Sequence, residues 1–272
     1  MNQPKSITDL GALAQNRRRA DPQSLFLQQA ARDEVNDRVE MVNKPFQSPA
    51  IVTPFPDLWS GRDGAAIVIP EQETLPLAVG QHDLVIHCLG LHWANDLVGQ
   101  LIQCRRALMP DGLMLAVALG GRTLHELRSC LAQAESSVTG GLSPRVAPMA
   151  EVRDLGALLQ RAGFALPVAD TVPFEVIYQS IWHLMRDLRA MGEANAMTAR
   201  LRHPTRRAVL DRAADLYVEN FPADQGGITA TFELIVLTGW APAESQQKPL
   251  RPGSAKTRLA DALRTDETPL SD

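Results

Sequence analysis

The sequence has few cysteines, no excess of basic charge and no long apolar run. Its three cysteines (Cys88, Cys104 and Cys130) show neither paired nor metal-ligand spacing, so we expect free thiols. A formal net charge of −4 argues against broad nucleic-acid binding, which requires a basic surface. No apolar run approaches the ~18 residues of a membrane span, and the polar N-terminus lacks a secretory signal. We therefore predict a cytoplasmic protein.

The sequence also lacks the residue spacings of familiar metal and nucleophile sites. Its six histidines are scattered, and His87 and His92 do not have the spacing of a metal-binding pair on a helix. No Ser–His–Asp or Cys–His set has supporting sequence context. The sequence therefore predicts neither a metal centre nor a nucleophilic triad.

What the sequence does contain is a clear strand–helix–strand unit. The stretch Asp83–Asp96 begins with an apolar run of the length of a strand buried on both faces. A polar corner, His92–Asn95, follows, and Asn95 or Asp96 can cap the helix that begins there. The helix stops at Pro110–Gly112, and a second buried strand, Leu113–Leu119, comes next. This order is typical of a parallel sheet.

Ligands of such sheets lie beyond the carboxyl ends of the strands. We therefore expect Cys88–Asn95 and Gly120–Thr123 to line the functional site. His92 and Trp93 follow the first of these strands directly, which favours a site wall with His92 as a polar or proton-handling group. The alternative is that Trp93 packs in the core and His92 is a satisfied polar residue.

Two strings of the sequence carry a family resemblance. "HDLVIHCLGLHWANDL" and "CRRALMPDGLMLAVALGGRTLHELR" resemble the fourth and fifth strands of class I S-adenosylmethionine-dependent methyltransferases. The stretches "GGLSPRVAP", "LMRDLRAMGEAN" and "RPGSAK" are similar to a branch that includes biotin-pathway malonyl-carrier methyltransferases and methyltransferase-like assembly factors of respiratory complex I. The resemblance covers roughly Phe26–Leu263. It implies an α/β fold with a doubly wound, mostly parallel, Rossmann-like sheet and a helical insertion before an antiparallel last strand.

The resemblance also implies a function. It predicts S-adenosylmethionine as the cofactor, a protein subunit of respiratory complex I (NADH dehydrogenase) as the partner, and an alternative location at the periphery of the inner membrane. In the assembly-factor family the fold is associated with arginine hydroxylation of a complex I subunit. The residues carried over are cofactor-binding Glu71, Leu89 and His92, and substrate- or partner-binding Trp93, Arg122, Thr123 and Arg128. Glu71 and Glu73 would face the adenine end, or they are plain surface acids.

The first predicted strand is where this sequence departs from the family. Class I methyltransferases carry a glycine-rich loop there, which lets the backbone approach the cofactor. Here Ala50–Thr53 is followed by Pro54–Gly61, with two prolines and two aromatic residues. Only about thirty residues separate Ile51 from Asp83, about half of what two βαβ crossovers need. One strand–helix unit is therefore missing, so the N-terminal half is shortened.

This departure leaves two function classes open. The first is an S-adenosylmethionine-dependent enzyme with an unusual loop. The second is a non-catalytic assembly or chaperone module that keeps the fold and the Gly120–Arg128 surface. A biotin-pathway methyltransferase is a third hypothesis, which the later branch motifs favour less.

The 272 residues fit one α/β domain with an added lobe. Residues 1–20 read as a flexible leader; its basic triplet Arg17–Arg19 is solvated, or it contacts an acidic partner or phospholipid head groups. The predicted domain covers residues 21–240, and its first helix starts at Asp21. We expect Thr123 to start another helix, with Glu126 as a capping-box acid. Helices between about 180 and 221 form a lid, Phe174–Tyr178 pairs antiparallel with the last strand, and residues 241–272 form a mobile tail.

Overall fold

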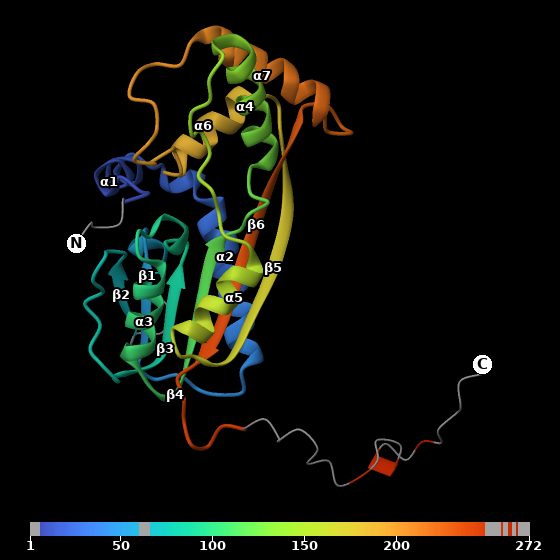
Figure 1. Cartoon of the computed structure of the whole chain (residues 1–272). Helices are drawn as coiled ribbons and strands as arrows, with labels where there is room; N and C mark the ends of the chain where they lie inside the picture. Colours follow the sequence, from blue (N-terminus) through green and yellow to red (C-terminus); the bar gives the residue numbers. More distant parts are fainter. Residues whose placement is uncertain (1–5, 60–65, 248–256, 258–260, 263–264, 266–272) are drawn as a thin grey trace. The chain divides into compact units, whose positions relative to one another are not determined.

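The computed structural model describes residues 6–59, 66–247, 257, 261–262 and 265 (Figure 1). The chain divides into two units, residues 1–242 and 243–272. The mobile tail that we expected at 241–272 falls largely outside the described residues. The helices of the first unit are α1 (Leu10–Arg18), α2 (Phe26–Met41), α3 (Leu97–Ala107), α4 (His125–Thr139), α5 (Val152–Arg161), α6 (Ile181–Ala190) and α7 (Arg207–Asn220), with 3-10 turns η1 (Pro22–Ser24), η2 (Pro56–Trp59) and η3 (Leu91–Trp93).

A six-stranded sheet with the order β2-β1-β3-β4-β6-β5 forms the centre of this unit. Its strands are β1 (Pro49–Thr53), β2 (Ile67–Pro70), β3 (His82–Cys88), β4 (Leu108–Leu119), β5 (Ala165–Tyr178) and β6 (Ile228–Trp240). The first four strands run parallel, whereas β6 pairs antiparallel with both β4 and β5. The mostly parallel sheet with an antiparallel last strand, which the sequence predicted, is thus confirmed.

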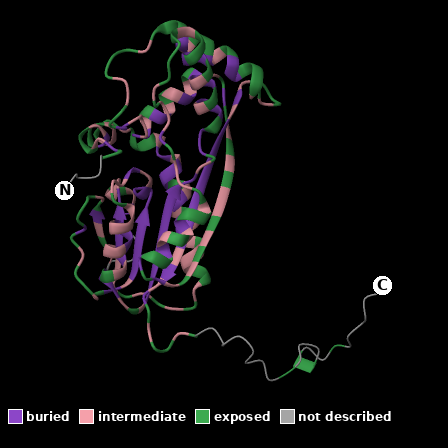
Figure 2. Ribbon diagram, in the orientation of Figure 1, coloured by how far each residue is buried: buried purple, intermediate pink, exposed green. Residues whose placement is uncertain are grey.

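The apolar strand runs are buried on both faces, as predicted (Figure 2). Successive side chains of a strand point to opposite faces of the sheet. Leu84 and Ile86 of β3 therefore join one core cluster, with α2, α4, α6 and α7, while Val85 joins the other, with α3 and α5. On β4, Leu115 and Met114 divide in the same way. Helices thus cover both faces and leave the carboxyl ends of the parallel strands as the place for a site.

The N-terminal half of the sheet is shortened at the connection between β1 and β2. Parallel neighbours are usually joined by a helical crossover of a dozen residues or more. Here residues 54–66 make the connection, and η2 is the only helical turn among those of them that the structure describes. β2 therefore pairs directly with β1, with Ile51 opposite Val68.

The N-terminal segment differs from the expectation. The leader that we took to be flexible contains α1, whose Leu13 is only 3% exposed. The helix expected to start at Asp21 begins at Phe26 instead. Asp21 caps η1, because its carboxylate accepts a hydrogen bond from the backbone N–H of Gln23 at 3.0 Å.

The capping box predicted at the start of α4 is also wrong. The helix begins one residue after Leu124, which has a φ of 54° and makes no side-chain cap. Thr123 instead donates from Oγ1 to the carbonyl of Glu233 at 3.3 Å and accepts from its N–H at 3.1 Å. The Glu126 carboxylate accepts from the N–H of Thr231 at 3.0 Å. Both side chains therefore bind the start of α4 to β6.

Among the described residues, no helix is both long and apolar enough to cross a membrane. The helices α6 and α7 occupy the region where we predicted a lid, and with α4 they lie beyond the sheet in Figure 1. α1 lies between these helices and the sheet. The arrowheads of β1, β2 and β3 point toward the side of the sheet on which α1 lies.

Candidate functional site

A cavity of about 830 Å³ lies at the carboxyl ends of β1, β2 and β3, against α1; we call it the first cavity. Parallel α/β sheets bind ligands at this edge. Its walls come from α1 (Leu10, Leu13, Ala14 and Arg17), Pro54 after β1, residues 70–74 after β2, His87 and Gly90 at the end of β3, Trp93–Asp96, and Gln100 of α3. The volume falls in the usual range of small-molecule sites.

An ion pair between Arg17 and Glu71 crosses this edge of the sheet. Arg17 Nη1 meets Glu71 Oε1, and both side chains are largely buried. The Glu71 carboxylate reaches past β1 to the turn after β3, where a Cβ on Gly90 would lie only 2.1 Å from Glu71 Oε2. A side chain at this position would displace the Glu71 carboxylate from its present place. Arg17 and Glu71 therefore take up space over the end of β1, where related folds place their glycine-rich loop.

His87 contributes a neutral imidazole to the same cavity. Burial lowers the pKa of His87 to about 4, although the hydrogen bond to Gln100 opposes this effect. Gln100 Nε2 donates to the carbonyls of Gln72 (2.7 Å) and Glu73 (3.1 Å), so its Oε1 faces His87 Nε2 at 3.4 Å as an acceptor. His87 Nε2 therefore carries the proton, and Nδ1 has a free lone pair.

A buried carboxylate, that of Glu193, lies behind Trp93. Glu193 Oε2 accepts hydrogen bonds from Trp93 Nε1 at 2.7 Å and from His92 Nε2 at 3.3 Å. Burial would raise the pKa of Glu193, but the charge and hydrogen bond of His92, together with Arg17 and Trp93, outweigh it and lower the pKa. Glu193 is therefore ionised at neutral pH.

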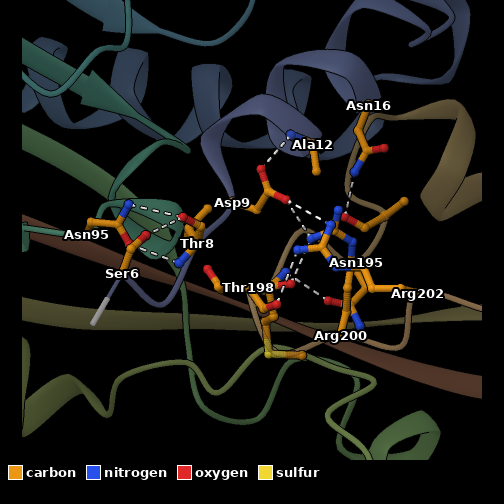
Figure 3. A network of polar contacts seen from close by, with 12 residues as sticks. Ser6, Thr8, Asp9, Ala12, Asn16, Asn95, Asn195, Thr198, Arg200 and Arg202 are labelled. Carbon is orange, nitrogen blue, oxygen red and sulfur yellow. Dashed lines mark hydrogen bonds and ion pairs between the residues drawn. The ribbon is translucent and has the colours of Figure 1, made fainter.

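The segment that carries α1 is fixed to the rest of the site by a polar network (Figure 3). Asn95 bonds both backbone groups of Thr8, at 2.9 and 3.1 Å. Asp9 caps α1 through the N–H of Ala12 and pairs with Arg200 at 3.0 Å. Arg202 also contacts Asp9 at this end of the helix. In the last turn of α1, Asn16 donates to the carbonyl of Ala194 at 2.9 Å. The helix is thus held over the first cavity from both ends.

A second cavity, of about 360 Å³, lies on the other side of Trp93. It is lined by residues of α4, α6 and α7, by the segment Glu193–Asn195, and by Arg145, Val146, Ala147 and Met149. Its loop wall is fixed by Arg145, which pairs with Glu135 at 2.6 Å. Trp93 lines both cavities, so its side chain is the wall between them.

The chain was compared with known proteins. No family model matches the chain. The chain is 40% identical over 197 residues to "Arginine-hydroxylase NDUFAF5, mitochondrial" of Danio rerio, covering 72% of this chain and 61% of that protein. The Homo sapiens protein of the same name is 40% identical over 199 residues, 71% of this chain and 56% of that one. The "Malonyl-[acyl-carrier protein] O-methyltransferase" of Methylovorus sp. is 37% identical over 182 residues, with 67% and 59% covered.

These matches confirm the resemblance to this branch of methyltransferase-like proteins. The chain spans about three fifths of the length of the curated relatives it matches. Among solved structures, YcgJ of Bacillus subtilis aligns with a TM-score of 0.48 at 10% identity, covering 78% of this chain and 99% of that one. Phosphoethanolamine N-methyltransferase 2 of Haemonchus contortus, solved with S-adenosyl-L-methionine, aligns with a TM-score of 0.43 at 8% identity, covering 78% and 53%.

The residues that the family resemblance implied for cofactor binding line different cavities in the structure. Glu71 lines the first cavity, whereas Leu89 and His92 line a small cavity of about 10 Å³ next to Glu193. Trp93 lies between the two large cavities. Only Glu71 and Trp93 of the carried-over residues therefore meet at the first cavity.

The residues carried over for a substrate or partner also divide. Thr123 lines the second cavity. Arg122 and Arg128 line neither cavity; Arg122 is exposed, and Arg128 donates to the carbonyls of Thr123 and Ala147 at 3.4 Å. Arg128 therefore supports the loop wall of the second cavity, and Arg122 remains available at the surface.

Sequence reasoning did not single out Arg17 or Glu193. Arg17 belongs to the basic triplet at the end of the supposed leader, and a charged run of that kind is usually solvated. Glu193 lies in the Met-Gly-Glu-Ala-Asn stretch, which the resemblance marks as typical of the branch. That motif was a usable signal for Glu193, whereas the local sequence carries none for Arg17.

The residues of the first cavity fit a polar ligand. Arg17 Nε and Nη2, Glu71 Oε2 and His87 Nδ1 are buried and have no hydrogen-bond partner in the protein. Such atoms usually find a partner in a ligand or in water. Phe55 is not part of the cavity wall, because its ring packs near Gly192, 3.4 Å from where a Cβ would lie. No group of His, Cys, Asp and Glu in the described part of the chain could hold a metal ion.

Proposed function

We propose that this protein is a methyltransferase-fold assembly factor of respiratory complex I, with S-adenosylmethionine in the first cavity and a segment of a complex I subunit in the second. The relatives named arginine hydroxylase NDUFAF5 support the branch, and the relatives named O-methyltransferase support the cofactor. Arg17, Glu71 and His87 would hold the polar parts of the cofactor, which supplies an electrophilic methyl group when it is bound. A cytoplasmic location stays a prediction.

The observation that carries this proposal is the wall that the two cavities share. Trp93 faces both cavities, and the Glu193 carboxylate lies against Trp93 and lines the second cavity. A ligand in the first cavity and a protein side chain in the second would therefore meet at this wall.

The chemistry of the wall favours a cationic protein side chain such as arginine. A guanidinium pairs well with a buried carboxylate and stacks on an indole ring. Glu193 supplies the carboxylate and Trp93 the ring. Arg145 also lines the second cavity, but Glu135 balances its charge. The arginine named in the relatives' activity is thus a substrate group that this wall would accept.

The test is genetic and uses the source organism. The gene is deleted, complex I is quantified on native gels, and its subunits are examined by mass spectrometry for methylated or hydroxylated arginine. We expect less assembled complex I and the loss of a modified arginine. Wild type and Glu219→Gln, an exposed carboxylate of α7, should restore both, whereas Glu193→Gln should not. Normal complex I in the deletion strain would refute the proposal.

A second candidate, an assembly module without catalysis, is favoured by the connection between β1 and β2. Pro54 and Phe55 stand where the glycine-rich loop of an enzyme would be, and among the described residues of this connection only the 3-10 turn η2 follows, with no α-helix. In this case complex I assembly would still depend on the gene, but no arginine would lose a modification. The same strains therefore separate the two candidates.

A further inference from the structure

The ion pair in the first cavity is incomplete in a specific way. An arginine and a carboxylate often pair through two parallel hydrogen bonds. Here only Arg17 Nη1 and Glu71 Oε1 meet, so Nη2 and Nε of Arg17 and Oε2 of Glu71 keep no partner although they are buried. The pair therefore leaves unpaired donors on Arg17 next to an unpaired acceptor on Glu71.

A third group completes the pattern. His87 Nδ1 is a buried acceptor without a partner, because Gln100 fixes the ring proton on Nε2. The same turn brings it close to Glu71, since a Cβ on Gly90 would lie 2.1 Å from Glu71 Oε2 and 2.9 Å from His87 Cε1. Three residues that line the cavity thus carry unpaired polar atoms, which are donors on Arg17 and acceptors on Glu71 and His87.

We propose that these three residues form a cradle for a zwitterionic α-amino-acid group, with the carboxylate on Arg17 and the ammonium between Glu71 Oε2 and His87 Nδ1. A carboxylate is a good acceptor for the two free guanidinium nitrogens, and an ammonium donates three hydrogen bonds. The cradle is assembled from α1, the end of β2 and the end of β3, so the N-terminal helix provides what a glycine-rich loop does not provide here.

This proposal deepens the proposed function, because it assigns the part of the cofactor that these residues recognise. The same chemistry would also hold a free α-amino acid. The cavity volume of about 830 Å³ leaves room for a nucleoside beside the cradle. The test therefore uses ligands that contain the amino-acid group, the nucleoside, or both.

The experiment is calorimetric titration of the full chain with S-adenosylhomocysteine, methionine and 5′-methylthioadenosine. The variants are Arg17→Ala, Arg17→Lys and Glu71→Gln, and the control is Arg18→Ala, an exposed arginine of the same helix. We expect S-adenosylhomocysteine to bind the wild type, and Arg17→Ala to weaken it about 10- to 100-fold, the loss of a charge-assisted hydrogen bond. Arg17→Lys should recover part of this loss, and Arg18→Ala should bind like the wild type.

Glu71→Gln guards against misfolding, because it keeps the shape of the side chain and removes only its charge. It should weaken S-adenosylhomocysteine and leave 5′-methylthioadenosine, which has no ammonium, unchanged. Binding of methionine alone at comparable strength would assign the cradle to free amino acids. The proposal is overturned if neither amino-acid ligand binds, or if both bind equally to wild type and Arg17→Ala. A deletion strain that still loses complex I would then show that the assembly function stands without the cradle.

Discussion

Glu193 is the residue whose replacement probes the shared wall most directly. Its carboxylate accepts hydrogen bonds from Trp93 and His92, which lie 100 and 101 positions away in the chain. Glu193→Gln keeps the size of the side chain and an acceptor oxygen but removes the charge. Glu193→Ala removes both acceptors. The two variants therefore separate the contribution of the charge from that of the hydrogen bonds.

The geometry sets the expected magnitudes. The bond from Trp93 is short, at 2.7 Å, and that from His92 is long, at 3.3 Å, so the first carries most of the energy. A hydrogen bond to a charged group contributes about 1.5–3 kcal/mol, and a neutral one about 1 kcal/mol. Glu193→Gln should therefore lower the free energy of unfolding by about 1–2 kcal/mol. Glu193→Ala leaves two buried donors unpaired and should cost about 3–5 kcal/mol.

The assay is urea unfolding at several pH values, with Glu219→Gln as the control on an exposed face. The pKa of Glu193 is lowered in the folded protein, so its carboxylate stabilises the fold above the ordinary pKa of 4.5. That contribution is lost as the pH falls through the lowered pKa. The difference in the free energy of unfolding between wild type and Glu193→Gln should therefore be largest at pH 7 and become smaller in acid. Equal stabilities at pH 7, or a difference that is independent of pH, would refute the reasoning.

Three further predictions concern the rest of the fold. The Arg145 hydrogen bond lowers the pKa of Glu135 to about 2, so its contribution to stability is complete above the ordinary value of 4.5 and lost toward pH 2; urea unfolding of Glu135→Gln should lack this acid dependence. Burial raises the pKa of Cys88 and Cys104 to about 12 and that of Cys130 to about 11, so thiol reagents should label them only in denaturant; rapid labelling of the native protein would contradict this. Gly226 and Gly227 both have a positive φ, 88° and 90°, so replacing either by alanine should lower the free energy of unfolding by about 1–2 kcal/mol. Only at Gly227 would the new Cβ also meet the Tyr178 carbonyl oxygen, at 2.3 Å. Thermal unfolding should therefore show Gly227→Ala less stable than Gly226→Ala by a further 1–3 kcal/mol or so.

Local sequence determined the elements that build the sheet. Leu84–Leu89 and Leu113–Leu119 are continuous apolar runs, and both became strands buried on two faces. Asp96 caps α3 because its short side chain reaches the N–H of Gly99 at 2.8 Å. Phe174–Tyr178 pairs antiparallel with the last strand, as expected. Periodicity and turn chemistry act over a few residues, so they can be read from the sequence.

The shortened connection between β1 and β2 could also be predicted from the sequence, because too few residues separate the strands. The distance along the chain from Ile51 to Asp83 leaves no room for two helical crossovers, and β2 pairs directly with β1. A helix does start near Thr123, as expected, but the caps expected of Asp21 and Thr123 do not form on the α-helices that follow them. Asp21 caps a 3-10 turn, and Thr123 bonds to β6. A capping residue in the sequence does not show which backbone it will meet.

The site itself was decided by tertiary structure. Arg17 and Glu71 come from a polar N-terminal helix and the end of a strand, and nothing in either local pattern indicates that they pair. Glu193 reaches Trp93 only because the segment after α6 folds back over the carboxyl ends of the strands. A charged side chain has the same local sequence whether it is solvated or buried. Only packing of distant segments decides which charges lose their water and must find each other, and here that packing made the two cavities and the wall between them.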